Sequence, residues 1–459
     1  MVATTPAIVV AAPSSGSGKT TVATGLMGAL RRSGHRVAPF KVGPDFIDPG
    51  YHALAAGRPG RNLDPVLVTE ARIGPLYRHG CTGADIAVVE GVMGLFDGRI
   101  DPDSDAPVIG STAHVASSLG APVVLVVDGS GQSQSVAALV HGFSTFDSGI
   151  RIGGVILNRV GSPRHEQVLR QACDRIGMPV LGAIPRASEL SVPSRHLGLV
   201  TAVEHGRRAR LAIDAMTDLV ARHVDLAAVA ALAAANVAAG PWDPLTAVGG
   251  AVDGSPVVAM AAGRAFSFGY AEHVEMLRAA GAEVVEFDPI TEALPAETDA
   301  LILPGGFPEQ HLPELSANVE VRRQIRQLAE HSPIYAECAG LTYLMTKLDD
   351  HPMCDVLQGT AQFTKRLTLG YRHAVASGDS VLHPSGHAAT GHEFHRTKVE
   401  FSTAYPSAWT FRVGDVTMND GAILNKVHAA YLHTHPAGQP TAVRSFVASA
   451  VPATTQPIQ

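Results

Sequence analysis

The residues with the clearest capacity for chemistry form a short loop, Pro13–Thr21, which reads PSSGSGKTT. The loop follows an apolar run, Ala7–Ala12, and precedes a helical pattern, so it stands where a strand turns into a helix. Small residues let backbone N–H groups close on phosphate oxygens, and the N-terminus of a helix adds partial positive charge. We therefore predict a nucleotide phosphate site, in preference to a Gly/Ser turn that only joins two elements.

Within this loop, Lys19 is expected to reach the outer phosphates, and the Thr20 hydroxyl is expected to ligate Mg²⁺. Pro13 occupies the position of the first glycine in the usual pattern, and the loop resembles the variant of dethiobiotin-synthetase-like ATPases. A later strand ends at Asn158, which we predict to contact the adenine. The predicted nucleotide contacts are Ser15, Gly16, Ser17, Gly18, Lys19, Thr20, Thr21 and Asn158.

Carboxylates follow two other apolar runs and would meet at the same sheet edge as the loop. Ile86–Glu90 ends in an acid, and Arg36–Val42 is followed by a Pro-containing segment with two more. Ligands of open α/β sheets bind at the carboxyl ends of the strands, and phosphoryl transfer needs acids that hold Mg²⁺ and orient the acceptor. An Asp beside Pro or Gly is also ordinary turn chemistry, but convergence at one edge favours a site. The predicted catalytic acids are Asp45, Asp48, Glu90 and Asp97, and the predicted Mg²⁺ ligands are Thr20, Glu90 and Asp45.

A second centre is predicted around Cys338, which stands between an apolar run, Pro333–Ala336, and a helical pattern. A cysteine on such a tight turn is expected to expose its thiol, and the helix N-terminus is expected to lower the thiol pKa. The backbone N–H groups of Gly306 and Ala339 are the predicted oxyanion hole. A lone cysteine is more often a small buried apolar residue, so this prediction depends on a base nearby.

The predicted base is His433, so the sequence predicts a Cys338–His433 pair for acyl transfer. His435 is the rival base, and the residue that orients the imidazole is left open. A further motif, His392–His395, has two imidazoles three positions apart with a carboxylate between them. That spacing is not the one of a zinc-binding helix, so we expect contact with substrate or between domains instead.

Two series of alternating strand and helix patterns must position these residues, which predicts an α/β fold with two tandem doubly wound domains. The strands expected in the first series are Ala7–Ala12, Arg36–Val42, Ile86–Glu90, Pro122–Asp128, Gly154–Asn158 and Pro179–Ile184. In the second they are Val257–Ala261, Glu283–Phe287, Ala300–Leu303 and Ile334–Ala336, with a helix over Ala271–Ala280. The predicted boundaries are a nucleotide-binding domain over residues 1–240, a linker over 241–255, a domain with the cysteine centre over 256–450 and a tail over 451–459.

The net charge, the apolar runs and the cysteine spacing argue against several classes of protein function. The 459 residues carry a net charge of −7, so the chain has no general field for attracting nucleic acid or anionic lipid. No apolar run approaches the ~20 residues that cross a bilayer, and we expect no secretion signal at the N-terminus. The 4 cysteines are widely spaced and form no CxxC pair, which favours a reducing cytoplasm over a disulfide framework or a zinc ribbon.

These motifs together resemble the cobyrinic or hydrogenobyrinic acid a,c-diamide synthase family of cobalamin biosynthesis, over essentially the whole chain except the termini. The stretches that carry the resemblance are Ser15–Thr21, Lys41–Pro49, Glu90–Gly98, Leu303–Glu309, Glu337–Leu341, Gly391–His395 and Tyr431–His435. The resemblance implies that residues 1–240 are a dethiobiotin-synthetase-like ATP-binding domain and that residues 256–450 are a class I glutamine amidotransferase domain. It also implies ATP and Mg²⁺ as cofactors and glutamine and a corrin ring as substrates; a homodimer is left open.

The family chemistry implied is stepwise. ATP phosphorylates the c-acetate carboxylate of the ring, Cys338 releases ammonia from glutamine, and ammonia displaces the phosphate; the a-acetate then follows in the same way. The rival interpretations are a cobyric acid synthase-like enzyme, a partitioning-type ATPase with a binding module, and a dethiobiotin-synthetase-like ligase with an appendage. A composition typical of a GC-rich aerobic bacterium favours the metal-free ring.

Overall fold

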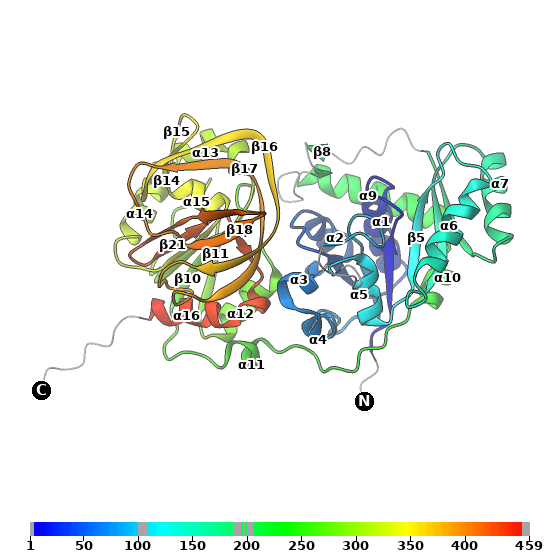
Figure 1. Ribbon diagram of the computed structural model, residues 1–459, viewed down its shortest axis with the longest axis horizontal. Coiled ribbons are helices and arrows are strands. Elements are labelled where there is room, and N and C mark those ends of the chain that lie inside the picture. Colours follow the sequence, from blue (N-terminus) through cyan, green and yellow to red (C-terminus); the bar gives the residue numbers. More distant parts are fainter. Residues whose placement is uncertain (1–3, 100–108, 187–193, 196–197, 200–205, 452–459) are drawn as a thin grey trace, which may run out of the picture. The chain divides into compact units, whose positions relative to one another are not determined.

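The computed structural model describes residues 4–99, 109–186, 194–195, 198–199 and 206–451, and it divides into two compact units, Met1–Trp242 and Asp243–Gln459 (Figure 1). Each unit has its own sheet and core and is described by itself. The segment predicted as a linker, 241–255, contains helix α11 (Pro244–Val248), which packs against α12 (Ala271–Ala279) and α16 (Pro440–Ala450). The predicted tail lies outside the described residues except for Val451.

The first unit is built on a parallel sheet with the strand order β3-β2-β4-β1-β5-β6-β7. The strands are β1 (Ala7–Ala11), β2 (Val37–Val42), β3 (Arg61–Leu63), β4 (Ile86–Glu90), β5 (Val123–Asp128), β6 (Ile152–Val160) and β7 (Val180–Pro185). All the strands predicted for this half are present, because a strand covered on both faces is a nearly continuous apolar run. The short β3 was not predicted, since its sequence, RNL, has no such run.

Helices cover this sheet, and their apolar side chains pack against those of the strands to form the core of the unit. The helices are α1 (Lys19–Arg32), α2 (Asp48–Ala56), α3 (Pro65–Val68), α4 (Glu70–Gly80), α5 (Thr112–Leu119), α6 (Ser135–Phe146), α7 (Pro163–Asp174), α9 (Arg207–His223) and α10 (Leu226–Leu232). A short pair, β8 (Ser194–Arg195) and β9 (Gly198–Leu199), stands apart from the sheet. One core cluster joins Ile8 and Val10 of β1 to Leu26 of α1 and Val220 of α9. Since β1 lies between β4 and β5, the loop after β1 and the acids after β4 end at the same edge.

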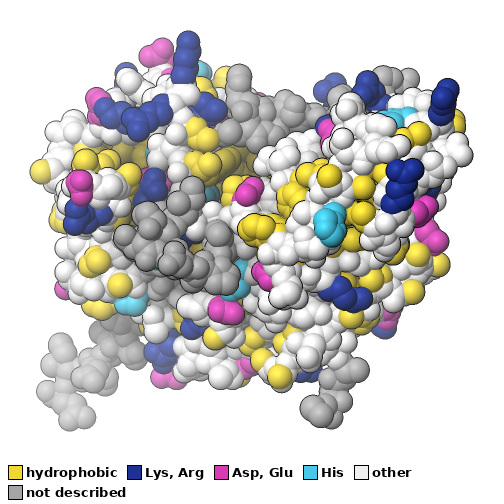
Figure 2. Space-filling view, turned by 45° about the vertical axis from the view of Figure 1, so that its right-hand side comes forward, with side chains coloured by type: hydrophobic (Ala, Val, Ile, Leu, Met, Phe, Trp, Pro, Cys, Tyr) yellow, Lys and Arg dark blue, Asp and Glu magenta, His cyan; other side chains and the backbone are white. Residues whose placement is uncertain are grey.

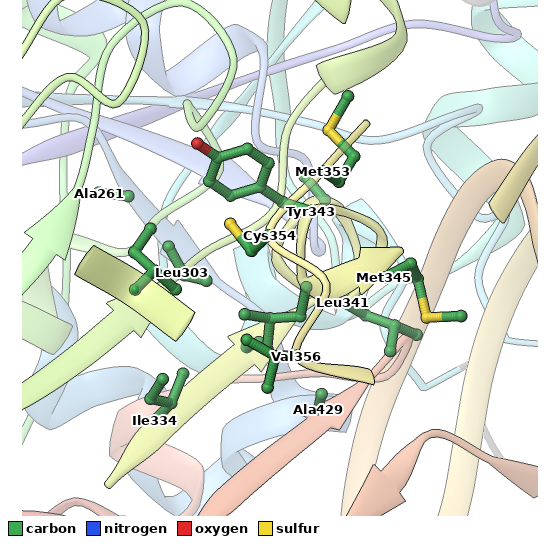
Figure 3. Packing of buried hydrophobic residues seen from close by; sticks show 14 of the residues in the cluster. Ala261, Leu303, Ile334, Leu341, Tyr343, Met345, Met353, Cys354, Val356 and Ala429 are labelled. Carbon is green, nitrogen blue, oxygen red and sulfur yellow. The ribbon is translucent and has the colours of Figure 1, made fainter. Parts of the chain in front are cut away.

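The second unit also contains a mainly parallel sheet, ordered β11-β10-β12-β13-β21-β20. Its strands are β10 (Val257–Ala261), β11 (Glu283–Phe287), β12 (Ala300–Leu303), β13 (Ile334–Glu337), β21 (Val427–Ala430) and the antiparallel β20 (Ala422–Leu424). Further helices are α13 (Leu312–Ala317), α14 (Val319–Leu328) and α15 (Ala339–Leu344), with 3₁₀ turns η1 (Pro308–Gln310) and η2 (Pro436–Gly438). Figure 3 shows Leu303, Ile334, Leu341 and Tyr343 packed in the core between this sheet and α15. The four predicted strands are therefore confirmed.

A second, largely antiparallel sheet, ordered β15-β14-β16-β17-β22 with β18 and β19 attached, was not predicted. Its strands are β14 (Met345–Leu348), β15 (His351–Pro352), β16 (Leu357–Ala376), β17 (Ala388–Phe401), β18 (Trp409–Val413), β19 (Val416–Asp420) and β22 (His433–Thr434). The long strands β16 and β17 are rich in polar residues and only partly buried, so they lack the apolar signal of the parallel strands. The sheet matters for function because β17 pairs with β22 and places His392 opposite His433.

Among the described residues, no helix is long and apolar enough to cross a membrane. Figure 2 shows Lys and Arg side chains interspersed with Asp and Glu over the face in view, so the described part of that face carries charges of both signs.

The close packing of α1 on α9 predicts the effect of a small substitution. A Cβ added at Gly25 would lie 2.6 Å from the Met216 carbonyl oxygen and 2.5 Å from a Val220 methyl group, both on α9. We therefore expect Gly25→Ala to lower the free energy of unfolding of this unit by about 1–3 kcal/mol, because the helices must separate. The measurement is thermal unfolding of the full chain by calorimetry.

The matched control is Gly142→Ala on α6, where an added Cβ would meet nothing within 4 Å. This variant should be neutral or more stable, since Ala has a higher helix propensity than Gly by about 1 kcal/mol. Equal behaviour of the two variants would contradict the described helix packing.

Candidate functional site

The phosphate loop joins β1 to α1 and takes backbone conformations that favour glycine. Gly16 and Gly18 have φ values of 80° and 93°. The Asn158 side chain donates a hydrogen bond to the Ser17 carbonyl at 2.9 Å, and a Cβ at Gly18 would lie 2.2 Å from the same Asn158 nitrogen. Asn158 thus holds the loop from the end of β6, while its contact with adenine stays a prediction.

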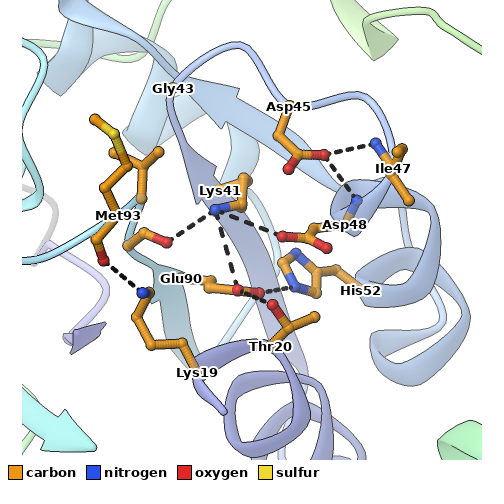
Figure 4. Close-up of polar contacts among 12 residues, drawn as sticks. Lys19, Thr20, Lys41, Gly43, Asp45, Ile47, Asp48, His52, Glu90 and Met93 are labelled. Carbon is orange, nitrogen blue, oxygen red and sulfur yellow. Dashed lines mark hydrogen bonds and ion pairs between the residues drawn. The ribbon is translucent and has the colours of Figure 1, made fainter. Parts of the chain in front are cut away.

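The loop residues Lys19 and Thr20 meet the acid at the end of β4 (Figure 4). The Thr20 hydroxyl donates to Glu90 Oε1 at 2.6 Å, and the Lys19 ammonium donates to the Met93 carbonyl. Lys19 is buried, and its burial and the nearby Lys41 lower its pKa. The structure therefore brings together a cation, a hydroxyl and a carboxylate, three groups that were predicted to act on phosphates and Mg²⁺.

Lys41 is a central member of this group that the sequence analysis did not assign. Its Nζ donates to the Gly91 carbonyl at 2.8 Å and lies 3.5 Å from Asp48 Oδ2 and 4.0 Å from Glu90 Oε1. Its side chain is only 4% exposed, yet Glu90 and Asp48 raise its pKa against the effect of burial. A single Lys inside the apolar strand VAPFKV was the available signal, since lysine is almost never fully buried unless it is paired.

The two buried carboxylates of this cluster have opposite proton affinities. Burial opposes ionisation of Glu90, but Lys41, His52 and Thr20 lower its pKa below the ordinary value. Burial and the neighbouring Asp45 and Glu90 raise the pKa of Asp48 well above the ordinary value. His52, also unassigned from the sequence, lies on α2 with its Nε2 2.6 Å from Glu90 Oε2. Paired acids whose pKa values are pushed apart in this way are typical of catalytic sites.

Asp45 and Asp97 lie in turns at the same edge. Asp45 Oδ1 accepts hydrogen bonds from the backbone N–H of Ile47 at 2.7 Å and of Asp48 at 3.0 Å, at the beginning of α2. Asp97 Oδ2 accepts one from the Gly94 N–H at 2.9 Å. Both carboxylates thus have the turn role that was the alternative interpretation, and their catalytic and metal-binding roles stay predictions.

The cysteine centre lies at the carboxyl end of β13. Cys338 has a φ of 49°, and its N–H donates to the Ala430 carbonyl at 2.7 Å. Its sulfur lies 3.7 Å from the Phe394 carbonyl of β17, and the backbone N–H groups of Ala339 and Gly306 act to lower the thiol pKa. The same two N–H groups are the predicted oxyanion hole, and their action on a substrate oxygen stays a prediction.

The expectation of an exposed thiol with a lowered pKa is wrong. Cys338 is 4% exposed, and burial, followed by the charges of Glu309 and Glu337, raises the thiol pKa more than the two N–H groups lower it. The wall formed by β17, which the sequence did not reveal, encloses the sulfur. Reaction therefore requires a base that removes the thiol proton when substrate is present.

His433 is fully buried at the start of β22, with its Nδ1 3.3 Å from Glu337 Oε2. His435, the rival base, accepts a hydrogen bond from the Ala437 N–H at 3.2 Å and has its Nε2 4.0 Å from Glu272 Oε2. The parallel pairing of β13 with β21 sets Glu337 opposite Ala430, directly before the segment that leads to His433. The contact of His433 with Glu337, the residue before Cys338, supports His433 as the proposed base.

The His392–His395 motif forms part of this wall. Phe394 contributes the carbonyl beside Cys338, and Glu393 Oε2 accepts a hydrogen bond from Arg372 at 2.5 Å. Within the described ranges, no group of three or more His, Cys, Asp or Glu residues is placed to hold a metal ion. The motif contributes a backbone carbonyl to the cysteine centre, and its contact with substrate or between domains stays a prediction.

Two family models match the chain. The CobQ/CobB/MinD/ParA nucleotide binding domain matches residues 8–200, and the CobB/CobQ-like glutamine amidotransferase domain matches residues 257–441. The first match contains the phosphate loop and Glu90, and the second contains Cys338 and His433.

Similar proteins cover almost the whole chain. A protein of Mycobacterium tuberculosis (strain ATCC 25618 / H37Rv) named hydrogenobyrinate a,c-diamide synthase is 68% identical over 97% of this chain and 98% of its own length. A protein of the same name from Streptomyces coelicolor is 52% identical, over 96% of this chain and 97% of its own. A cobyrinate a,c-diamide synthase of Synechococcus sp. is 38% identical, over 98% of this chain and 99% of its own.

The buried charges around Lys41 predict a coupled effect on stability. Lys41→Met removes the cation but leaves Glu90 and Asp48 buried, so we expect a loss of about 3–5 kcal/mol in the free energy of unfolding. Glu90→Gln in the same chain removes the ionised carboxylate and should recover a measurable part of that loss. Denaturant unfolding of both single variants and of the double variant gives the coupling free energy. Strictly additive effects would contradict the described cluster.

Proposed function

The chain belongs to the hydrogenobyrinate/cobyrinate a,c-diamide synthase family, and from this premise we propose that it amidates the a- and c-acetate carboxylates of hydrogenobyrinic acid. It is a glutamine-hydrolysing carbon–nitrogen ligase that uses ATP. The observation that carries the proposal is one chain holding both a phosphate loop whose Thr20 contacts Glu90 and an enclosed cysteine, Cys338, on a strand-to-helix turn. The metal-free ring is chosen because the 68% and 52% identical relatives bear its name, whereas the 38% identical relative bears the name of the cobalt-containing ring.

The first unit makes the carboxylate reactive. A carboxylate is a poor electrophile until one oxygen becomes a leaving group, and transfer of the γ-phosphoryl group of ATP to that oxygen provides it. Lys19 and Lys41 supply positive charge where the transferring group would sit, and Asp45, Asp48 and Asp97 are assigned to orient the acceptor. Their shared position at the carboxyl ends of neighbouring strands supports this assignment.

The residues present fit Mg²⁺, because the Thr20 hydroxyl and the Glu90 carboxylate already meet at 2.6 Å and oxygen donors are the ligands that this ion prefers. Bound there, the ion would offset charge on the β- and γ-phosphates. His52 would keep the Glu90 carboxylate in place, and Asn158 would keep the loop in its binding conformation.

The second unit supplies nitrogen. His433 takes the thiol proton of Cys338 as the sulfur attacks the side-chain amide carbon of glutamine. The N–H groups of Gly306 and Ala339 hold the negative oxygen of the tetrahedral intermediate, which collapses with cleavage of the C–N bond. His433 returns the proton to the leaving nitrogen, ammonia departs, and water then hydrolyses the thioester to glutamate. Ammonia attacks the acyl phosphate and displaces inorganic phosphate, which gives the carboxamide.

We place these steps in the cytoplasm and retain a homodimer as a proposal that light scattering would test.

The products test the substrate assignment. Incubation with ATP, Mg²⁺, glutamine and hydrogenobyrinic acid should lower the mass of the ring in two steps, each equal to one exchange of OH for NH₂. Cobyrinic acid and rings already amidated at a and c serve as comparison substrates in the same mass-spectrometric assay. Amidation of other carboxylates in preference to a and c would overturn the assignment.

Because one unit activates the carboxylate and the other releases ammonia, two variants should differ in amidation with free ammonia. Cys338→Ala should lose glutamine-dependent amidation but keep amidation with free ammonia, because the ATP site is intact. Lys19→Met should lose amidation with both nitrogen donors. A folded Cys338→Ala protein that loses both donors equally would contradict the proposal.

A further inference from the structure

One acid in the cysteine centre has no role in the steps above. Glu337 directly precedes Cys338 at the end of β13. Its Oε2 lies 3.3 Å from Nδ1 of His433, and its Oε1 accepts a hydrogen bond from the Thr434 N–H at 3.0 Å. The Tyr335 hydroxyl also donates to Oε1. A single carboxylate therefore contacts the imidazole and the backbone of the residue that follows it.

Glu337 is a buried carboxylate that remains ionised. It is 9% exposed, and although burial opposes its charge, His433, Tyr335 and the Thr434 N–H together lower its pKa. Burial and the Glu337 charge raise the pKa of Tyr335 well above its usual value, so the phenol keeps the proton that it donates. An ionised carboxylate in such surroundings accepts hydrogen bonds and cannot donate them.

The backbone conformation at Cys338 explains how Glu337 and Cys338, which are adjacent in the chain, both contact groups of the cysteine centre. Cys338 takes a φ of 49°, a conformation that is strained for a non-glycine residue, and the Ala430 carbonyl holds it there by accepting the Cys338 N–H. The turn directs the thiol to the Phe394 carbonyl of β17, while Glu337 remains in the strand and reaches His433. Strain at the nucleophile thus allows the preceding acid to contact the base.

The residue two positions after His433 is a histidine, so it cannot provide the carboxylate that orients the imidazole of His433. His435 stands two residues beyond His433, and its ring accepts the Ala437 N–H and lies beside Tyr270, with ring centroids 4.1 Å apart. The carboxylate nearest to it is Glu272, at 4.0 Å, which belongs to α12 rather than to the strand end that carries Cys338.

We propose that Glu337 is the positioning residue that completes a Cys338–His433–Glu337 triad, with the acid placed directly before the nucleophile in the chain. Its carboxylate accepts the Nδ1–H of His433, which fixes the tautomer whose Nε2 can take the thiol proton. The same charge stabilises the imidazolium that forms when Cys338 attacks. This inference rests on the proposed glutaminase reaction and assigns the orienting residue within it.

Replacing Glu337 with Gln tests the proposal with little change in shape. The amide offers one acceptor oxygen to three donors, namely Tyr335, the Thr434 N–H and the His433 Nδ1–H, so the imidazole loses its acceptor or changes tautomer. We expect kcat for glutamate release from glutamine to fall by about 10²- to 10⁴-fold, with KM for glutamine changed by less than about threefold. Amidation with free ammonia should be unchanged, because the ATP site is untouched.

The matched control is Glu272→Gln, which alters the buried acid beside His435. This variant should keep kcat for glutamate release, and both variants should unfold at temperatures close to that of the unmodified chain. Glu337→Gln with unchanged kcat, or with equal losses of glutamine- and ammonia-dependent amidation, would overturn the triad. A loss of kcat confined to Glu272→Gln would assign the base to His435 instead. Absence of glutamate release by the unmodified chain, with all substrates present, would refute the proposed function itself.

Discussion

Buried charge at the ends of parallel strands is the constraint on which both centres depend. A buried ion is tolerated only when opposite charge and hydrogen bonds compensate it. In the first unit Lys41 compensates Glu90 and also lies 3.5 Å from Asp48 Oδ2. In the second, Glu337 is compensated by His433 and by two further donors. Because these side chains must satisfy one another before any ligand arrives, the sites are organised in advance, and little reorganisation is needed when the substrates bind.

The two units meet this constraint in chemically different ways. The first collects cations and carboxylates, which suits a reaction that moves a phosphoryl group between oxygens. The second encloses a neutral thiol, which in the proposed reaction gives its proton to a base as the sulfur attacks the amide carbon of glutamine. Burial of Cys338 raises the pKa of its thiol, which favours the protonated form.

The sequence predicted what depends on local pattern. Continuous apolar runs predict the parallel strands. The motifs at the carboxyl ends of those strands predict the site residues, such as Lys19, Glu90 and Cys338. Lys41 and His52 were missed because they lie inside a strand and a helix, where their burial depends on partners distant in the sequence. The enclosure of Cys338 was not predicted, because β16 and β17 lack an apolar run. The role proposed for Glu337 was not predicted either, because its 3.3 Å contact with His433 joins residues far apart in the sequence.

The central claim is that one polypeptide activates a carboxylate by phosphorylation and supplies the nitrogen that replaces the phosphate. Hydrogenobyrinic acid labelled with ¹⁸O in its acetate carboxylates, incubated with ATP, Mg²⁺ and glutamine labelled with ¹⁵N at the side-chain amide, tests both halves at once. The account predicts ¹⁵N in the new carboxamides and one ¹⁸O atom transferred to inorganic phosphate for each amide formed. Appearance of ¹⁸O in AMP instead, or of unlabelled nitrogen in the product, would contradict it.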